Sequence, residues 1–272
     1  MPRILDYNGD EADRTVTVAS LIALKAQNLQ VAQVTASSAD EAAAAEAAGI
    51  EMVVCMSEHV PAVRRGSSRV FVTAAIDFTG AVTVDELLRV ALESLSNGAD
   101  AVITARGMSS VARMAEEDIP VMGHLGFVPK KSTLYGGVRA VGKTAAEATN
   151  LWRKFQQLEH AGAFAVECEL IPAKVMAEIN ERTGLTTISL GSGTDADVAF
   201  LFTSDICGES SRRPRHARAY GDLGALYDQI ADERVNALTA FRSDVAERRF
   251  PDETEVAHVD GAELRQFIET LS

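Results

Sequence analysis

The chain alternates short apolar runs with longer segments whose apolar residues recur at helical spacing. The first pair joins the apolar run at 31–35 to an Ala/Glu-rich segment at 38–48, which begins at Ser38 and is followed by Gly49. Serine at a helix start and glycine just past a helix end are common boundary signals. The pattern therefore predicts a strand followed by a helix.

The same alternation continues along most of the chain. Thr83 and Glu86 have the spacing of a capping box at the start of an amphipathic helix that Gly98 ends. Runs that are apolar on both faces are typical of a parallel sheet covered by helices. Further strands are predicted at 52–55, 70–73, 101–104, 119–122, 163–168, 187–190 and 199–202, and further helices at 109–117, 144–160 and 173–182.

About eight β runs in 272 residues predict a closed (β/α)₈ barrel, a TIM barrel, for which ~250 residues is typical. An open, doubly wound sheet is the alternative, but the segment 35–38 after the first strand lacks the glycine-rich phosphate loop of that fold. We expect one barrel domain over residues 1–272, with an N-terminal helical segment and a C-terminal helical extension at about 222–248 and 261–271. A long loop at 126–142 carries Lys130, Lys131 and Tyr135, and loops of this length are often functional lids.

The charge balance disfavours two classes of binding partner. The chain has 39 acidic and 26 basic side chains and a formal net charge of −13, which argues against binding nucleic acid or an anionic membrane. No apolar run reaches the ~20 residues of a membrane-spanning helix, and the opening residues lack the apolar region of a signal peptide. Three widely spaced cysteines form neither a disulfide framework nor a CxxC site. We therefore expect a cytoplasmic protein.

Two carboxylates are the first candidates for chemistry, because barrel enzymes react at the carboxyl ends of their strands. Glu167 and Glu169 are two apart on a predicted strand, so they share one face while Cys168 lies on the other. An inward-facing carboxylate needs a partner or a raised pKa, and a general base benefits from a pKa near neutrality. We expect Glu169, nearest the loop, to be the general base; the alternative for both is pairing with nearby basic groups.

His124 and Arg106 also follow predicted strands. His124 lies in the run Gly123–Gly126, where glycine permits close approach of the backbone to a ligand. The Arg106 guanidinium has the geometry to grip a substrate carboxylate, although a salt bridge at the barrel rim is an equal alternative.

Three further residues after strands, Ser57, Glu58 and Asp77, are candidates for substrate binding together with Gly123 and Arg106. No HxxxH or DxD spacing accompanies them, so the sequence predicts no metal ligands in the protein.

Several stretches together resemble one family, the ketopantoate hydroxymethyltransferases (3-methyl-2-oxobutanoate hydroxymethyltransferases). Residues 119–129 resemble the family's GHLG-x-x-P segment, and residues 136–144 are similar to its GGYKVQGRT loop. Residues 161–172 resemble its AGA…LECVP run, and residues 214–223 its PKF-x-K-x-Y-x-DL segment. The similarity extends from about Thr35 to Pro251, which is most of the chain.

The resemblance implies a barrel of the phosphoenolpyruvate mutase/isocitrate lyase superfamily that assembles as a homo-oligomer. Its activity would be the transfer of a one-carbon unit, in pantothenate biosynthesis, from 5,10-methylenetetrahydrofolate to an α-keto acid held on Mg²⁺. By position, Glu169 matches the family's general base and His124 its GHLG histidine.

The departures from the family all concern the cation and the keto acid bound to it. Ser57 and Ala75 stand where the resemblance implies two metal-binding aspartates. Ile103 replaces a substrate-binding lysine, and Ala105 replaces a glutamate. Hard cations need several oxygen ligands, so Mg²⁺ is expected for the family while its ligands are largely absent from this chain.

These observations favour an enzyme of aldol-type chemistry acting on a small α-keto acid, either by one-carbon transfer or by a metal-free retro-aldol reaction. In this hypothesis Glu169 moves a proton next to the carbonyl, His124 hydrogen-bonds the substrate, and Arg106 stabilises charge. One alternative is a non-catalytic oligomeric barrel that binds a small carboxylate. Another is an enzyme like phosphoenolpyruvate mutase.

Overall fold

The computed structural model describes residues 3–210 and 212–271. Within them, eight parallel strands close a barrel, in which β10 pairs with both β9 and β3. This confirms the predicted TIM barrel and excludes the open sheet. The strands are β3 (Val31–Thr35), β4 (Met52–Met56), β5 (Phe71–Ala75), β6 (Ala101–Ile103), β7 (Val121–Gly126), β8 (Ala165–Glu169), β9 (Thr186–Leu190) and β10 (Val198–Leu201).

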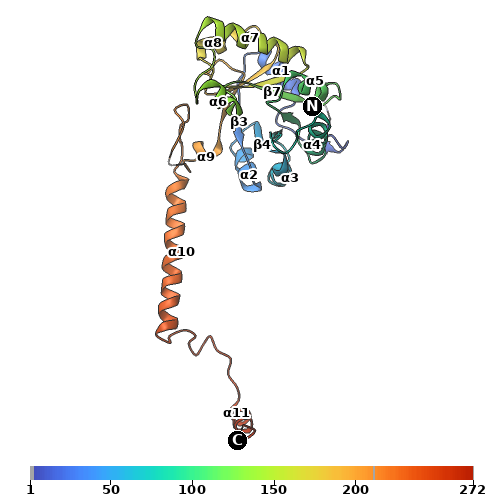
Figure 1. Cartoon of the computed structure of the whole chain (residues 1–272). Coiled ribbons are helices and arrows are strands. Elements are labelled where there is room, and N and C mark those ends of the chain that lie inside the picture. The colour runs from blue at the N-terminus through green and yellow to red at the C-terminus, as the bar shows by residue number, and fades with distance from the viewer. Residues whose placement is uncertain (1–2, 211, 272) are drawn as a thin grey trace. The chain divides into compact units, whose positions relative to one another are not determined.

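Helices cover the outside of the strands (Figure 1). Capping boxes at Ser38–Glu41 and Thr83–Glu86 begin two of them, as the sequence predicts. Two helices outside the segment 126–142 were not predicted. They are α3 (Val60–Gly66), which follows the short 3-10 helix η1 (Ser57–His59), and α9 (Thr203–Ile206). The covering helices are α2 (Ala39–Ala47), α3 (Val60–Gly66), α4 (Val84–Ser96), α5 (Met108–Ala115), α7 (Ala145–His160) and α8 (Ala173–Asn180), and a short α9 (Thr203–Ile206) follows β10.

The core has two layers because successive side chains of a strand point to opposite faces. Val53 and Val72 belong to the layer between strands and helices, which also holds Phe155. Met52 and Phe71 belong to the layer inside the barrel. Burial of one such large apolar side chain stabilises the fold by about 1.5–3 kcal/mol. The alternation therefore decides which residues of each strand face the barrel interior.

The N-terminal segment has a helix, as expected, and a hairpin that was not predicted. The helix is α1 (Val18–Ala26), and the hairpin pairs β1 (Ile4–Leu5) with β2 (Glu11–Ala12). Strands of two residues are too short to give a periodic pattern in the sequence.

The expected lid between Gly126 and Gly142 contains helical turns. It includes the 3-10 helix η2 (Pro129–Lys131) and the single turn α6 (Ser132–Tyr135). The preceding strand also runs further than predicted, because β7 keeps pairing with β8 as far as Gly126 opposite Glu169. The expectation that His124 follows its strand was therefore wrong, since the residue lies within β7.

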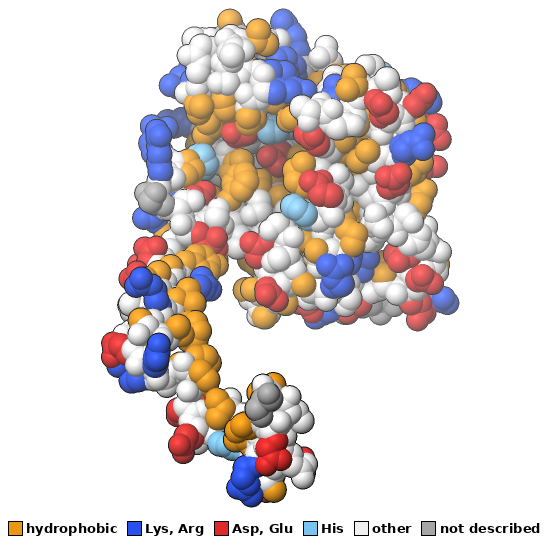
Figure 2. Space-filling view, turned by 60° about the horizontal axis from the view of Figure 1, so that its bottom comes forward, with side chains coloured by type: hydrophobic (Ala, Val, Ile, Leu, Met, Phe, Trp, Pro, Cys, Tyr) orange, Lys and Arg blue, Asp and Glu red, His pale blue; other side chains and the backbone are white. Residues whose placement is uncertain are grey.

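Contacts divide the chain into two compact units, Met1–Tyr220 and Gly221–Ser272. The second unit is helical, as predicted, with α10 (Leu223–Ala246) and α11 (Gly261–Glu269). Hydrophobic side chains form a stripe along α10, which Figure 2 shows in orange. Among the described residues, no helix has the length and apolar character needed to cross a membrane.

Candidate active site

Neighbouring strands bring three ionisable side chains together at the carboxyl end of the barrel. His124 comes from β7, and Glu167 and Glu169 come from β8. His124 is opposite Glu167 in the strand register, and Gly126 is opposite Glu169. Cys168 lies in the outer core layer, as the sequence predicts. The alternation of the strand therefore turns both glutamates toward the interior, beside the histidine.

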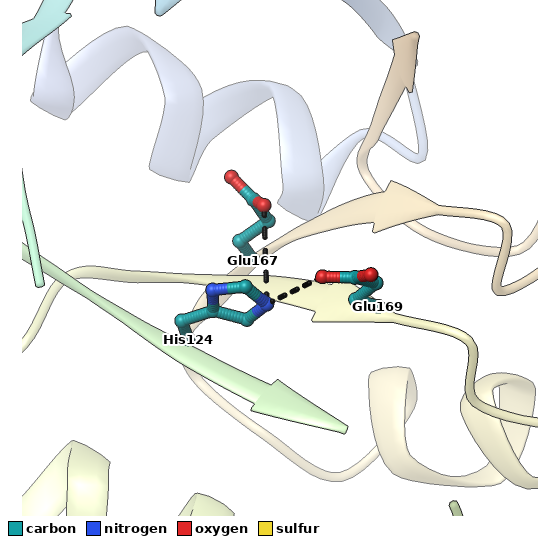
Figure 3. A group of neighbouring side chains, drawn as sticks. All are labelled: His124, Glu167 and Glu169. Atoms are coloured by element: carbon teal, nitrogen blue, oxygen red, sulfur yellow. Dashed lines mark hydrogen bonds and ion pairs between the residues drawn. The ribbon is translucent and has the colours of Figure 1, made fainter. Parts of the chain in front are cut away.

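One nitrogen of the His124 ring points toward both carboxylates (Figure 3). Its Nε2 atom is 3.1 Å from Oε2 of Glu169 and 4.0 Å from Oε1 of Glu167. The exposed side-chain fractions of His124, Glu167 and Glu169 are only 12%, 9% and 13%. One imidazole nitrogen thus faces two carboxylates in a site that is shielded from water.

The surroundings of this group raise the pKa of two of its residues, His124 and Glu167. Burial alone lowers the pKa of His124, but the hydrogen bond to Glu169 and the nearby negative charges of both glutamates outweigh burial and raise that pKa. Burial raises the pKa of Glu167, the charge of Glu169 adds to the increase, and His124 opposes it. His124 and Glu167 therefore hold protons more readily than the isolated side chains would.

A cavity of about 680 Å³ opens beside this group, and His124 and Glu167 line it. Figure 2 shows a hollow in the barrel unit where hydrophobic side chains lie beside acidic and histidine side chains. The polar lining includes Thr35, Thr104 and Asp77. Most of the exposed wall is apolar, with Val54, Met56, Ala75, Ile76, Phe78, Ile103, Ala105, Phe200 and Phe202 among the lining residues. The cavity suits a small organic ligand that has a polar end and an apolar part.

Of the predicted substrate contacts, Asp77 lines the cavity, whereas Ser57 and Glu58 are not among its lining residues. Asp77 accepts hydrogen bonds from Thr79 and Gly80, which lower its pKa. Ser57 and Glu58 belong to η1, where the Ser57 hydroxyl donates to Glu58 at 3.4 Å. Asp77 therefore shapes its own loop at the cavity edge.

The Arg106 side chain forms hydrogen bonds with backbone carbonyl groups of a neighbouring loop. Its Nη2 donates to the carbonyl oxygen of Phe78 at 2.7 Å and also to that of Ala81. The guanidinium thereby ties down the loop after β5, which carries cavity-lining residues. Within the described residues Arg106 forms no salt bridge, and its buried Nε atom has no hydrogen-bond partner.

Gly123 serves packing. A Cβ atom at this position would overlap the side chain of Leu158 on α7. The absence of a side chain therefore lets α7 approach β7 closely.

Sequence reasoning missed the side of the cavity formed by β3 and β10. Thr35, Phe200, Phe202 and Ser204 line it there, and the two phenylalanine rings are 5.4 Å apart. The sequence could have indicated these residues, because the predicted strands end at 35 and 202 and a barrel site lies at the carboxyl ends of its strands. Hydroxyl and phenyl groups carry no distinctive acid–base chemistry, so the residue types did not draw attention.

Among residues 3–210 and 212–271, His124, Glu167 and Glu169 form the one group whose ligand atoms are near enough to hold a metal ion together. One ligand atom from each residue lies within 4.8 Å of the others. This donor set is one imidazole nitrogen and two carboxylate oxygens.

Residues 53–253 match the family model described as ketopantoate hydroxymethyltransferase. The chain is 30% identical over 282 residues to the 3-methyl-2-oxobutanoate hydroxymethyltransferase of Roseiflexus sp. (strain RS-1), covering 94% of this chain and 99% of the relative. It is 32% identical over 265 residues to the enzyme of the same name from Carboxydothermus hydrogenoformans, covering 88% of this chain and 94% of that enzyme.

Solved structures share the fold at low sequence identity. A phosphonopyruvate hydrolase complex with oxalate and Mg²⁺ matches with a TM-score of 0.51 and 15% identity, covering 94% of this chain and 99% of that chain. A 2,3-dimethylmalate lyase of the PEP mutase/isocitrate lyase superfamily matches with a TM-score of 0.50 and 13% identity, covering 94% of this chain and 100% of that chain. These likenesses support the barrel fold predicted from the sequence.

Proposed function

Because the chain belongs to the ketopantoate hydroxymethyltransferase family, we propose that it makes or breaks a carbon–carbon bond next to the carbonyl group of a small α-keto acid. The observation that carries this proposal is the contact between His124 and Glu169 at the mouth of the barrel. The family assignment favours aldol-type chemistry over the non-catalytic barrel and over the phosphoenolpyruvate mutase-like alternative.

Glu169 is the proposed general base. Its carboxylate removes a proton from the carbon next to the keto group, which leaves an enolate. That carbon then attacks the one-carbon unit of 5,10-methylenetetrahydrofolate, the proposed donor. The two carbon–nitrogen bonds to the one-carbon unit break, water supplies the hydroxyl group of the hydroxymethylated product, and tetrahydrofolate leaves. In the reverse direction the carbon–carbon bond breaks, and Glu169 returns the proton to the enolate carbon.

His124 is the proposed hydrogen-bond donor. Its Nε2 is 3.1 Å from Glu169, so the ring holds that carboxylate in place and stands beside the reacting carbonyl. When Glu167 is ionised, its charge raises the pKa of His124 and so favours the protonated ring. A protonated ring stabilises the oxygen on which charge develops when the proton leaves carbon.

The residues at the family's cation positions do not fit Mg²⁺. Ser57 and Ala75 stand where the resemblance places metal-binding aspartates, and Ala75 forms part of an apolar wall. The remaining donor group, around His124, offers an imidazole nitrogen, which suits zinc or iron better than magnesium. No step of the proposed mechanism therefore passes through a metal ion.

The sharpest test is proton exchange, because it needs no one-carbon donor. We expect the protein to exchange the C3 proton of 3-methyl-2-oxobutanoate in D₂O, as followed by proton NMR. Glu169→Gln should slow the exchange at least ~100-fold, in the range usual for loss of a general base. Glu93→Gln, on the exposed side of α4, is the matched control and should leave the rate unchanged.

Metal dependence and product formation complete the test. Exchange should continue in EDTA, and methylenetetrahydrofolate should then give a hydroxymethylated product. Exchange that EDTA abolishes and Mg²⁺ restores would refute the metal-free mechanism. Keto-acid binding without exchange or product, unchanged in Glu169→Gln, would establish a non-catalytic barrel.

We also propose that the protein is a homo-oligomer in the cytoplasm. Helix α10 presents apolar side chains of which about half or more is exposed: Leu226 (50%), Ile230 (52%), Leu238 (63%) and Phe241 (51%). Apolar stripes of this kind commonly pack against another helix or chain. Light scattering after size-exclusion chromatography tests this, and a mass equal to one chain would contradict it.

A further inference from the structure

A second cavity, of about 220 Å³, lies behind β7 between the loop after that strand and helix α7. None of its lining residues lines the cavity at the barrel mouth. The lining is Leu125, Gly126, Val128, Lys131, Tyr135, Arg139, Val141, Glu147, Asn150, Leu151 and Lys154. The proposed mechanism uses none of these side chains.

Two lysines face this cavity without an acidic partner. Lys131 ends η2 and Lys154 lies on α7, so the two lysines come from different elements of the cavity wall. Neither side chain forms an ion pair or hydrogen bond with any residue of 3–210 or 212–271. Partial burial and the charge of Lys154 together lower the pKa of Lys131, which agrees with two positive charges in proximity.

The carboxylate that lines the same cavity, that of Glu147, already has other partners. Its Oε1 pairs with Nη2 of Arg139 at 2.8 Å. Its Oε2 accepts hydrogen bonds from the backbone N–H groups of Gly142 and Lys143, both at 3.1 Å. The lysine charges are therefore left without compensation by Glu147, although the chain as a whole carries a net charge of −13.

We infer that this cavity binds a small oxyanion, namely a phosphate group. Lysine ammonium groups are common phosphate ligands, and an anion between them would relieve their mutual repulsion. Tyr135 and Asn150 also line the cavity, and a phenol hydroxyl and an amide can each donate a hydrogen bond to an oxyanion. The volume equals that of about seven water molecules, which accommodates free phosphate or the phosphate of a small monoester.

A bound anion would connect the loop to the barrel. Lys131 belongs to the segment 126–142, whereas Lys154 belongs to a helix packed on β7. The same segment includes Phe127, whose N–H donates to the Glu169 carbonyl oxygen at 2.7 Å. The oxyanion would therefore hold in place a segment that adjoins the backbone of Glu169.

The test is calorimetric titration of the full chain with inorganic phosphate and, separately, with glycerol 3-phosphate. We expect saturable binding that Lys154→Gln and Lys131→Gln each weaken at least ~10-fold. Lys154→Arg keeps the charge and should restore most of the affinity. Tighter binding of the monoester would identify a phosphorylated metabolite as the ligand, and equal or tighter binding of phosphate would identify the free ion.

Lys130→Gln is the matched control. Its Nζ lies 4.2 Å from the ring centroid of Phe78, and Lys130 is not part of the cavity lining. Phosphate affinity should be unchanged in this variant. Absence of saturable binding, or equal weakening by the Lys130 and Lys154 variants, would overturn the proposal, with circular dichroism verifying that each variant is folded.

Discussion

Gly126 and Glu169 are directly opposite each other in strands β7 and β8, with no room for a side chain on the glycine. A Cβ atom on Gly126 would overlap the carbonyl oxygen of Glu169, and the φ angle of +87° already favours glycine. The next residue, Phe127, donates its N–H to that same carbonyl oxygen at 2.7 Å. The backbone of the proposed base is thus held by a glycine and by the start of the loop.

Gly126→Ala should therefore displace Glu169 from His124. We expect proton exchange to fall at least ~10-fold, because small displacements of a catalytic group cost that much or more. Gly136→Ala is the control, since Gly136 also has a positive φ, +73°, but nothing lies within 4 Å of an added Cβ. That variant should lose only the ~1–2 kcal/mol of left-handed strain in urea unfolding and keep its exchange rate. Equal effects of the two alanines would contradict this account.

The pH dependence of stability should reflect the buried proton-binding group. The pKa of His124 is raised above its ordinary 6.5, and the pKa of Glu167 is raised above its ordinary 4.5. A group with a raised pKa stabilises the fold most below its unfolded-state pKa, and this contribution is lost as the pH rises through its folded-state pKa. These two groups should therefore lower the free energy of unfolding as the pH rises from about 4.5 to beyond 6.5.

Glu167→Gln removes the carboxylate part of that dependence. Urea unfolding at about pH 5 and about pH 8 should show the variant gaining stability relative to the parent protein at the higher pH. Each unit by which the Glu167 pKa is raised corresponds to about 1.4 kcal/mol of such a gain. Glu93→Gln supplies the baseline, and a parallel pH profile for Glu167→Gln would show that Glu167 does not titrate in this range.

Introducing aspartate at positions 57 and 75 tests whether the chain fails to fit Mg²⁺ because these two carboxylates are missing. Ser57→Asp combined with Ala75→Asp should create magnesium affinity, because hard cations bind clustered carboxylate oxygens. Calorimetric titration with Mg²⁺ should give binding at least ~10-fold tighter for the double variant than for the parent. Equal affinity in both proteins would mean that the parent chain binds Mg²⁺ through other groups.

The sequence predicts the barrel well because its strands are apolar on both faces and its helices begin with strong caps, as at Ser38 and Thr83. Spacing also predicts that Glu167 and Glu169 share a face, since strand geometry has a period of two. The contact between His124 and Glu169 depends on which strands neighbour each other in space, and this is not a local property of the sequence. The backbone contacts of Arg106 likewise depend on a loop whose path no periodicity describes.

Arg106 gives the last prediction. Its Nη2 atom donates to both the Phe78 and Ala81 carbonyl oxygens, and the shorter side chain of lysine would not carry its ammonium group to that position. Arg106→Lys should therefore lower the free energy of unfolding by about 1.5–3 kcal/mol, the range for hydrogen bonds to charged groups. Because Phe78 lines the cavity, KM for the keto acid should rise more than kcat falls. A raised KM with unchanged stability would instead indicate that the guanidinium turns to the substrate carboxylate, the role expected from the sequence.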